Sequence, residues 1–171
     1  MIPRNPVRPN VLLLFGAVWA LVLGTSLAGC QPQSVPATAT GQEIYTQYCA
    51  QCHQADGNGI ERAFPPLRGT DWVNGDTGRL IRLVLYGMSG PIEVNGERYN
   101  NAMTPHGFLS DEQVAAVLTF VRSSFENTAD AVTADEVTRV RMSEGERGLF
   151  QADELTHLLG IPDPDTLSAA P

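Results

Sequence analysis

The chain has 171 residues, with 11 basic and 19 acidic side chains and a formal net charge of −8. This length suits one folded domain with a tail and excludes two independent cores. The excess of acidic groups argues against nucleic acid as a partner, because a phosphate-binding surface needs positive charge.

The first thirty residues have the features of an export signal. Arg4 and Arg8 form a basic start, residues 11–23 are apolar, and small residues precede Cys30. This ending resembles the lipobox of bacterial lipoproteins, which implies cleavage before Cys30, acylation of its thiol and export across the inner membrane. An uncleaved membrane anchor is the alternative, since the uncharged stretch is nearly long enough to span a bilayer. Both interpretations tether the domain to a membrane on the periplasmic side.

Residues 30–40 are rich in Pro, Gln, Ser, Ala and Thr. No apolar period runs through them, so we expect a flexible linker between the lipidated Cys30 and the domain. The globular part is predicted to begin at Gly41.

Cys49-Ala-Gln-Cys52-His53 is the most informative motif of the chain. Two thiols three positions apart, followed at once by an imidazole, are typical of covalent attachment of a c-type haem, with His53 as an axial iron ligand. A thioredoxin-like dithiol should follow a strand, and a zinc site needs a second ligand pair. Neither is visible, because the chain has only one further cysteine and two further histidines. The expected cofactor is one covalently bound haem c.

Two amphipathic helices are predicted. The first ends in the attachment motif, since Ile44, Tyr45 and Tyr48 recur at helical spacing just before it. The second begins at Ser110, which forms a capping box with Gln113 and is followed by acids in the first turn. Its apolar stripe consists of Val114, Val117, Leu118, Val121 and Phe125.

These features resemble the class I cytochromes c over residues 41–125, about half the chain. In that family a glycine and an aliphatic-aromatic pair precede the haem motif, as Gly41 and the following Ile-Tyr pair do here. The resemblance implies an all-α class I cytochrome c fold, a small helical domain around a covalently bound haem with a small hairpin and loop region. It also implies that the last helix crosses the first, with Val117 against Gly41 and Phe120 against Tyr45.

The segment after the attachment motif matches the same family. Phe64-Pro-Pro-Leu-Arg-Gly69 has the family's proline, leucine and glycine spacing. By that match, the carbonyl of Pro65 accepts a hydrogen bond from the His53 ring, which orients the ring and makes it a stronger donor to iron.

A helix and a hairpin are predicted next. Asp76 or Thr77 caps the helix, which ends at Gly87, and an Asn95-Gly96 turn joins the two strands of the hairpin. Candidates for contacts with the haem or its propionates are Trp72, Arg79, Arg82 and Tyr99.

Met103 is the predicted sixth ligand of the iron. It lies in the loop before the second capped helix, where the resembling family places its axial methionine, although Thr104 separates it from the proline that commonly follows directly. A thioether stabilises ferrous iron and fills the coordination sphere. His106 in the same loop is the main rival and would give a bis-histidine haem, whereas Met88 is expected to pack locally and Met142 to lie in the tail.

Residues 126–171 extend beyond the resemblance. Helices are predicted over 134–142, with Val137 and Val140 inward, and over 148–159. This C-terminal helical extension is expected to wrap its own domain, with a docking arm for a larger complex as the alternative. The predicted organisation is a signal peptide (1–29), a linker (30–40), a cytochrome c domain (41–125) and the extension (126–171).

The sequence therefore predicts an electron carrier and not a catalyst. It resembles single-haem lipoprotein cytochromes of bacterial respiratory chains, such as the monohaem subunit of alternative complex III. This resemblance implies redox partner proteins of a respiratory chain and a lipid anchor on the periplasmic side. Two alternatives stay open: a fixed subunit of a respiratory complex, or a five-coordinate haem that binds small molecules or reduces peroxide.

Overall fold

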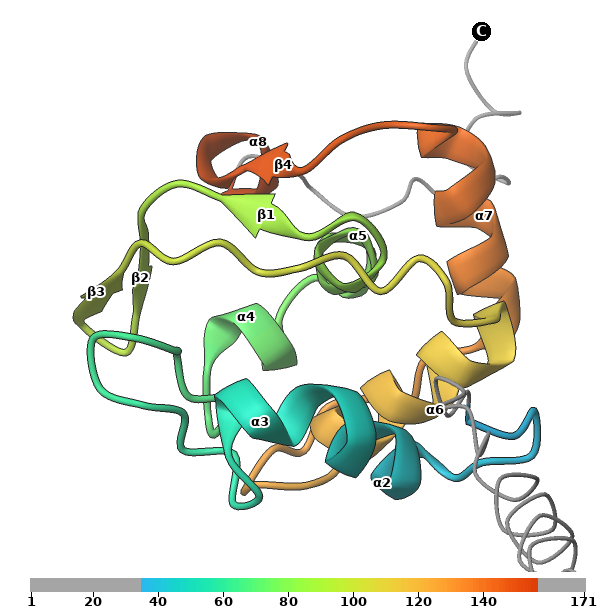
Figure 1. Ribbon diagram of the computed structural model, residues 1–171, viewed down its shortest axis with the longest axis horizontal. Helices are drawn as coiled ribbons and strands as arrows, with labels where there is room; N and C mark the ends of the chain where they lie inside the picture. The colour runs from blue at the N-terminus through green and yellow to red at the C-terminus, as the bar shows by residue number, and fades with distance from the viewer. Residues whose placement is uncertain (1–34, 157–171) are drawn as a thin grey trace, which may run out of the picture. The chain divides into compact units, whose positions relative to one another are not determined.

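Helices are the main regular secondary structure between residues 35 and 156, the part of the chain that the computed structural model describes (Figure 1). The predicted signal peptide, Cys30 and the residues from 157 onward lie outside this part. No helix within it is both long and apolar enough to cross a membrane. The helices are α2 (Gly41–Ile44), the π-helix η2 (Tyr45–Cys49), α3 (Ala50–His53), α4 (Asp71–Asn74), α5 (Thr77–Tyr86), α6 (Asp111–Arg122), α7 (Ala134–Glu144) and α8 (Ala152–Thr156).

Side-chain caps determine where the longer helices begin. The Ser110 hydroxyl accepts a hydrogen bond from the backbone N–H of Gln113, and the Gln113 side chain accepts one from the backbone N–H of Ser110. The predicted capping box of α6 is therefore confirmed. Asp76 accepts a hydrogen bond from the backbone N–H of Arg79 and begins α5, and Gly87 ends that helix, both as predicted.

The described part of the chain begins within the predicted linker. Thr40 and Glu43 form a second reciprocal capping box at the start of α2. Val35 packs against the core, and the side-chain amide of Gln113 donates hydrogen bonds to the carbonyls of Val35 and Pro36. Residues 35–40 are therefore fixed to α6 instead of remaining free.

Helices α2 and α6 cross at Gly41. A Cβ atom there would lie 2.1 Å from the carbonyl oxygen of Ala116, so only glycine permits this approach. The ring centroids of Tyr45 and Phe120 are 5.5 Å apart, which confirms that predicted contact. Val117 was expected against Gly41, but α6 turns Ala116 toward α2 and Val117 toward the cavity described below.

Helix α6 ends before the predicted apolar stripe does. Phe125 follows the helix with a left-handed φ of 54°, and its ring packs against Tyr45 from there. The buried guanidinium of Arg122 donates hydrogen bonds to the carbonyls of Val73, Gly75 and Asp130. These bonds satisfy the buried charge and join the end of α6 to α4 and to the start of the extension.

The predicted hairpin is confirmed. Strands β2 (Ile92–Val94) and β3 (Glu97–Tyr99) pair antiparallel around Asn95 and Gly96. These two residues have φ angles of 52° and 82°. A two-residue hairpin loop with a type I′ turn requires such positive φ angles at both of its central residues.

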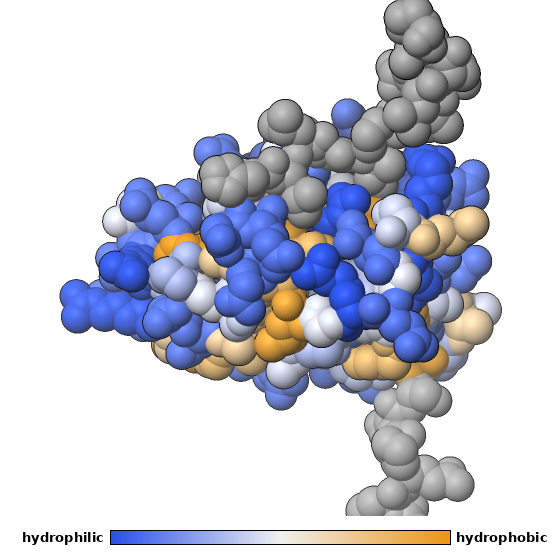
Figure 2. Space-filling model, turned by 90° about the horizontal axis from the view of Figure 1, so that it is seen from above, coloured by the Kyte–Doolittle hydropathy of each residue, from blue (hydrophilic) through white to orange (hydrophobic). Residues whose placement is uncertain are grey.

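The described part of the C-terminal extension, residues 126–156, packs on its own domain, as expected. Helix α7 lies against α5 and α6 with Val137 and Val140 fully buried. The helix predicted over 148–159 is wrong in its first part, because β4 (Phe150–Gln151) pairs in parallel with β1 (Met88–Ser89) and α8 begins only at Ala152. Figure 2 views this side of the molecule and shows a mostly hydrophilic outer surface.

Candidate functional site

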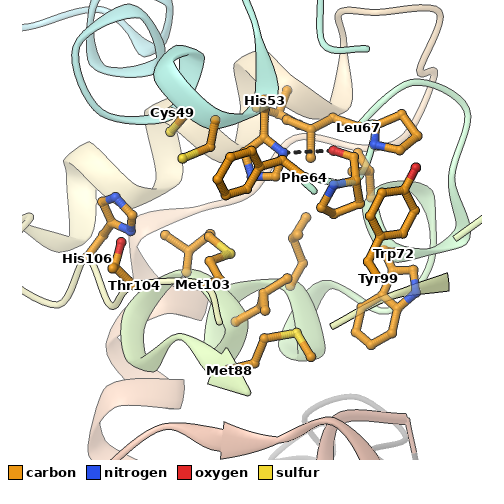
Figure 3. A pocket seen from close by; sticks show the side chains of 18 of the residues that line it. Cys49, His53, Phe64, Leu67, Trp72, Met88, Tyr99, Met103, Thr104 and His106 are labelled. Atoms are coloured by element: carbon orange, nitrogen blue, oxygen red, sulfur yellow. Dashed lines mark hydrogen bonds between the residues drawn. The ribbon is translucent and has the colours of Figure 1, made fainter. Parts of the chain in front are cut away.

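An apolar cavity of about 350 Å³ lies between α3 and the loop that precedes α6 (Figure 3). Its volume falls in the range of cofactor and small-molecule sites, roughly 300–1,000 Å³. Elements far apart in sequence contribute the apolar walls, which include Leu67, Trp72, Val73, Leu80, Leu83, Val84, Ile92, Val94, Tyr99, Leu109, Val117, Leu118 and Val121.

Cys49 and Cys52 line one side of this cavity as half-buried thiols. Cys49 ends η2 and Cys52 lies in α3, so the two thiols stand on one continuous helical segment. Burial, together with the neighbouring Cys52, raises the pKa of Cys49 to about 11. A reactive dithiol of the thioredoxin type needs a lowered pKa at its attacking thiol and follows a strand, whereas the pKa of Cys49 is raised and the motif follows helix α2.

His53 points into the cavity from the end of α3, and the chain turns away directly after it at Gln54, whose φ is 62°. The Nδ1 atom of the ring lies 3.0 Å from the carbonyl oxygen of Pro65. Since a carbonyl only accepts, Nδ1 carries the proton and Nε2 keeps its lone pair for a ligand. Burial lowers the pKa of His53, and this effect outweighs the Pro65 hydrogen bond, which acts in the opposite direction. The lowered pKa favours the neutral ring, the form that metals bind.

The loop that carries Pro65 depends on a residue from the extension. The side-chain amide of Asn127 donates hydrogen bonds to the carbonyls of Leu67 and Val121, and its oxygen accepts from the backbone N–H of Gly69 and from the side chain of Asn74. Asn127 is 4% exposed. Sequence reasoning missed it, because an isolated asparagine after a helix has no periodic or motif signal.

Met103 faces His53 across the cavity (Figure 3). It belongs to the segment 100–109 between β3 and α6, which we call the Met103 loop. Its backbone exchanges two hydrogen bonds with Met88, one from Met103 N–H to the Met88 carbonyl at 2.9 Å and one in the reverse direction at 3.2 Å. The structure thus brings together His53 and Met103, which are fifty positions apart, on opposite sides of one apolar space.

The rival ligand His106 also lines the cavity but lies among aromatic side chains. Its ring is 6.3 Å from that of Tyr48 and 5.8 Å from that of Phe108, measured between centroids. Its backbone N–H donates to the carbonyl of Val84. Burial lowers the pKa of His106 as well.

The other predicted contact residues divide into two groups. Trp72 and Tyr99 line the cavity, and the guanidinium of Arg79 stacks on Trp72 at 4.6 Å. Arg82 was expected near the cavity but is buried beneath the extension, where its Nε donates to Glu144 at 2.6 Å. Because α5 directs its Leu83 and Val84 face to the cavity, Arg82 on its other side meets α7.

Met88 and Met142 also differ in their surroundings. Met88 is 3% exposed and lines the cavity beside Met103, so its local packing is confirmed and it belongs to the site as well. Met142 is 79% exposed on α7.

A mainly helical domain that encloses an apolar cavity, with a Cys-x-x-Cys-His motif on one side and a methionine on the other, defines a c-type cytochrome. The chain belongs to the cytochrome c family, which it matches over residues 38–125. Its fold is that of the class I cytochromes c.

Several known proteins are similar to this chain. A cytochrome c-552 from Thermus thermophilus is 41% identical over 114 residues, which cover 61% of this chain and 76% of that protein. The cytochrome c subunit of a gluconate 2-dehydrogenase from Pantoea cypripedii is 38% identical over 61% of this chain, and a cbb3-type cytochrome c oxidase subunit from Rhodobacter capsulatus is 32% identical over 57%. The matched regions are only 24% and 32% of those two subunits, respectively.

Membership of this family implies a covalently bound haem c, and the residues present fit one. The walls are apolar, as a porphyrin face requires. The thiols of Cys49 and Cys52 have the attachment spacing and lie at one side of the cavity. The imidazole of His53, whose Nε2 has a free lone pair, faces the thioether of Met103 across the cavity. The comparisons and the cavity thus agree on the cofactor.

Proposed function

We propose that this protein transfers single electrons through one haem c bonded to Cys49 and Cys52, with His53 and Met103 as the axial ligands of the iron. The observation that carries this proposal is that the imidazole and the thioether face each other across one apolar cavity. A bound haem supplies one-electron cycling between ferric and ferrous iron. With both axial positions filled, the protein is an electron carrier and not a catalyst.

The side chains around the cavity have distinct functions in this proposal. Pro65 fixes the His53 ring through its carbonyl and strengthens the imidazole as a donor. The apolar walls exclude water, and the soft thioether of Met103 favours ferrous iron, so the reduction potential is higher than with two imidazoles.

Electron exchange with partners is proposed to occur beside Phe108. This ring is 66% exposed, and it packs edge-on against Tyr48 at 5.2 Å. Tyr48 and His106 both line the cavity, so the exposed ring is directly connected to the cavity wall. A small apolar contact suits an electron carrier, which must dissociate as readily as it binds.

The partners are proposed to be redox proteins of a respiratory chain at the periplasmic side of a membrane. Support comes from the relatives, which include cytochrome subunits of dehydrogenases and of an oxidase. Because those subunits contain the matched region as a part, a fixed subunit of a larger complex is the second candidate. Purification in mild detergent separates the two, since a shuttle elutes alone and a fixed subunit elutes with its complex.

Cys30 is proposed to hold the lipid that keeps the domain at the membrane. The lipobox-like sequence before it supports this assignment. Cys30→Ser should release the protein into the soluble periplasmic fraction. Retention of the variant in the membrane would favour the uncleaved anchor.

A visible spectrum of the purified protein tests the haem and its ligation together. We expect a sharp α band in the reduced protein, at the position typical of c-type haem, and no loss of colour on acid-acetone extraction. Carbon monoxide should bind the ferrous protein only slowly. Rapid stoichiometric binding would show a five-coordinate haem and overturn the assignment of Met103, and it would favour the ligand-binding alternative.

A further inference from the structure

The Met103 loop depends on β1 for its backbone position. Between β3 and α6 the loop is irregular, and Met103 exchanges both of its backbone hydrogen bonds with Met88. Gly87 brings the two segments together, because a Cβ atom at this position would lie 2.3 Å from the carbonyl oxygen of Met103. A displacement of β1 would therefore displace the methionine.

Strand β1 in turn depends on the C-terminal extension. It has only two residues, and so short a strand has no stability without a partner. Its other edge pairs with β4, where the backbone N–H of Phe150 donates to the carbonyl of Gly87 at 3.2 Å. In Figure 1 β4 and α8 lie directly over β1. The methionine loop, β1 and β4 are thus three adjacent segments joined by backbone hydrogen bonds.

The Phe150 side chain fills the space next to Met88. It is 2% exposed and forms one apolar cluster with Met88, Ala152 and Leu155, against which Met103 packs. The guanidinium of Arg147 lies 3.3 Å from the centroid of the Phe150 ring. Phe150 is therefore enclosed between the segment that supports Met103 and a cation of the extension.

Ion pairs attach this part of the extension to the domain. Glu144 at the end of α7 accepts from Arg82 of α5 at 2.6 Å and from Arg147 at 3.3 Å. Arg147 also pairs with Glu154 of α8 at 3.1 Å. Arg82 and Glu144 are only 8% and 17% exposed in their side chains, so solvent screens this pair weakly.

We propose that Phe150 is a positioning residue for Met103, acting through Met88, and that the extension thereby strengthens the bond between the iron and its sixth ligand. This inference rests on the proposed ligation by Met103. It assigns to residues 144–155 a role beyond wrapping the domain, because loosening them should weaken the sixth ligand before the fold is lost.

Imidazole binding to the ferric holoprotein tests the proposal, because imidazole binds iron only when the thioether has left. Phe150→Ala should raise the imidazole affinity about tenfold, since apparent affinity follows the fraction of protein that is open to the ligand. Phe150→Leu, which keeps part of the volume, should raise it less. The matched control is Val137→Ala, which truncates a fully buried residue of α7 outside the Met88 cluster and should leave the affinity unchanged.

The same titration in a Met103→Ala background isolates the route of the effect. There Phe150→Ala should add no further affinity, since no thioether remains to be displaced. The proposal would be overturned by an unchanged imidazole affinity in Phe150→Ala. It would also be overturned if Val137→Ala raised the affinity equally, or if the rise caused by Phe150→Ala persisted in the Met103→Ala background. If Phe150→Ala does not fold, Phe150→Leu gives the same comparison. Failure of the ligation itself has a separate signature, because Met103→Ala alone would then leave the imidazole affinity at the parent value.

Discussion

The ring nitrogen Nδ1 of His53 lies 3.0 Å from the carbonyl oxygen of Pro65, twelve residues away in the chain. The carbonyl makes Nδ1 the protonated nitrogen, so Nε2 is the nitrogen available inside the cavity. The acceptor is a backbone carbonyl, which no substitution at position 65 removes. The hydrogen bond that orients the His53 ring therefore does not depend on the side chain at that position. The methionine side of the cavity has no comparable protection, because its donor atom belongs to a side chain.

Met103→Ala should abolish the weak near-infrared band of a ferric haem with a sulfur ligand. The midpoint potential should fall by on the order of 0.1 V, a small part of the roughly 0.8 V that axial ligands span. His106→Ala is the matched control, because it alters the same loop and should keep both properties. If the parent protein lacks the band and only His106→Ala lowers the midpoint potential, the iron has two histidine ligands. Absorption spectroscopy and redox titration provide both measurements.

Phe108→Ala should slow electron self-exchange by about fivefold, as expected for loss of one exposed aromatic contact. Met142→Ala is the matched control, since it removes a similarly exposed apolar side chain, 79% exposed, from α7. Both variants should change the free energy of unfolding by less than about 1 kcal/mol. Mixing ferrous and ferric protein and measuring line broadening by NMR gives the exchange rate. Equal rates in the two variants would place the exchange surface elsewhere.

Gly41→Ala should destabilise the protein by about 3 kcal/mol, the upper range for overpacking. The added methyl group would lie 2.1 Å from the Ala116 carbonyl oxygen, which belongs to the backbone of α6 and cannot rotate away. Gly148→Ala is the control, because no atom lies within 4 Å of its added Cβ. Denaturant unfolding of the two holoproteins measures the difference. Equal stability would show that α2 and α6 separate readily at this crossing.

Asp111 should make stability depend on pH at the acidic end. Burial raises the pKa of this carboxyl group, but hydrogen bonds from Thr138 and Arg141, with the arginine charge, outweigh burial and lower the pKa below 3.8. A carboxyl group whose pKa is lower in the folded state stabilises the protein at pH values above its unfolded-state pKa. This stabilisation is lost as the pH falls through the folded-state pKa. Asp111→Asn should therefore cost about 1 kcal/mol at neutral pH and almost nothing near pH ~2.

Urea unfolding at the two pH values measures this difference. Asp135→Asn in the first turn of α7 is the control, since Asp135 is exposed and tests the helix dipole alone. A cost for Asp111→Asn that stays constant with pH would show that its charge has no part in the contact between α6 and α7.

Local signals allowed part of the structure to be predicted from the sequence. The Ser110 capping box, the Asp76 cap and the Asn95-Gly96 turn each depend on side chains within three residues, so their patterns are visible in the chain. The crossing at Gly41 followed from the family resemblance, but its partner was wrong by one position. Whether Ala116 or Val117 faces α2 depends on the rotation of α6, which the whole core determines.

Contacts between distant segments could not be predicted in the same way. Phe150 pairs with β1 more than sixty residues earlier, and Asn127 joins the Pro65 loop to α6. Each is a single residue without periodicity. Arg82 was predicted to contact the haem because its charge is visible in the sequence. Its actual partner, Glu144, could not be predicted, because the pairing depends on how α7 packs against α5. The thiols and His53 were clear because covalent attachment requires them to be adjacent.

The pairing of β4 with β1 has a consequence for the order in which the site is completed. Synthesis proceeds from the N-terminus, so Cys49, Cys52 and His53 emerge about 100 residues ahead of Phe150. The segment that carries the thiols is therefore made while the opposite wall of the cavity still lacks β4, its outermost strand. The β4 pairing that completes the methionine side can therefore form only after Phe150 has emerged, and an early stop near residue 145 should yield a coloured protein whose iron is open to added ligands.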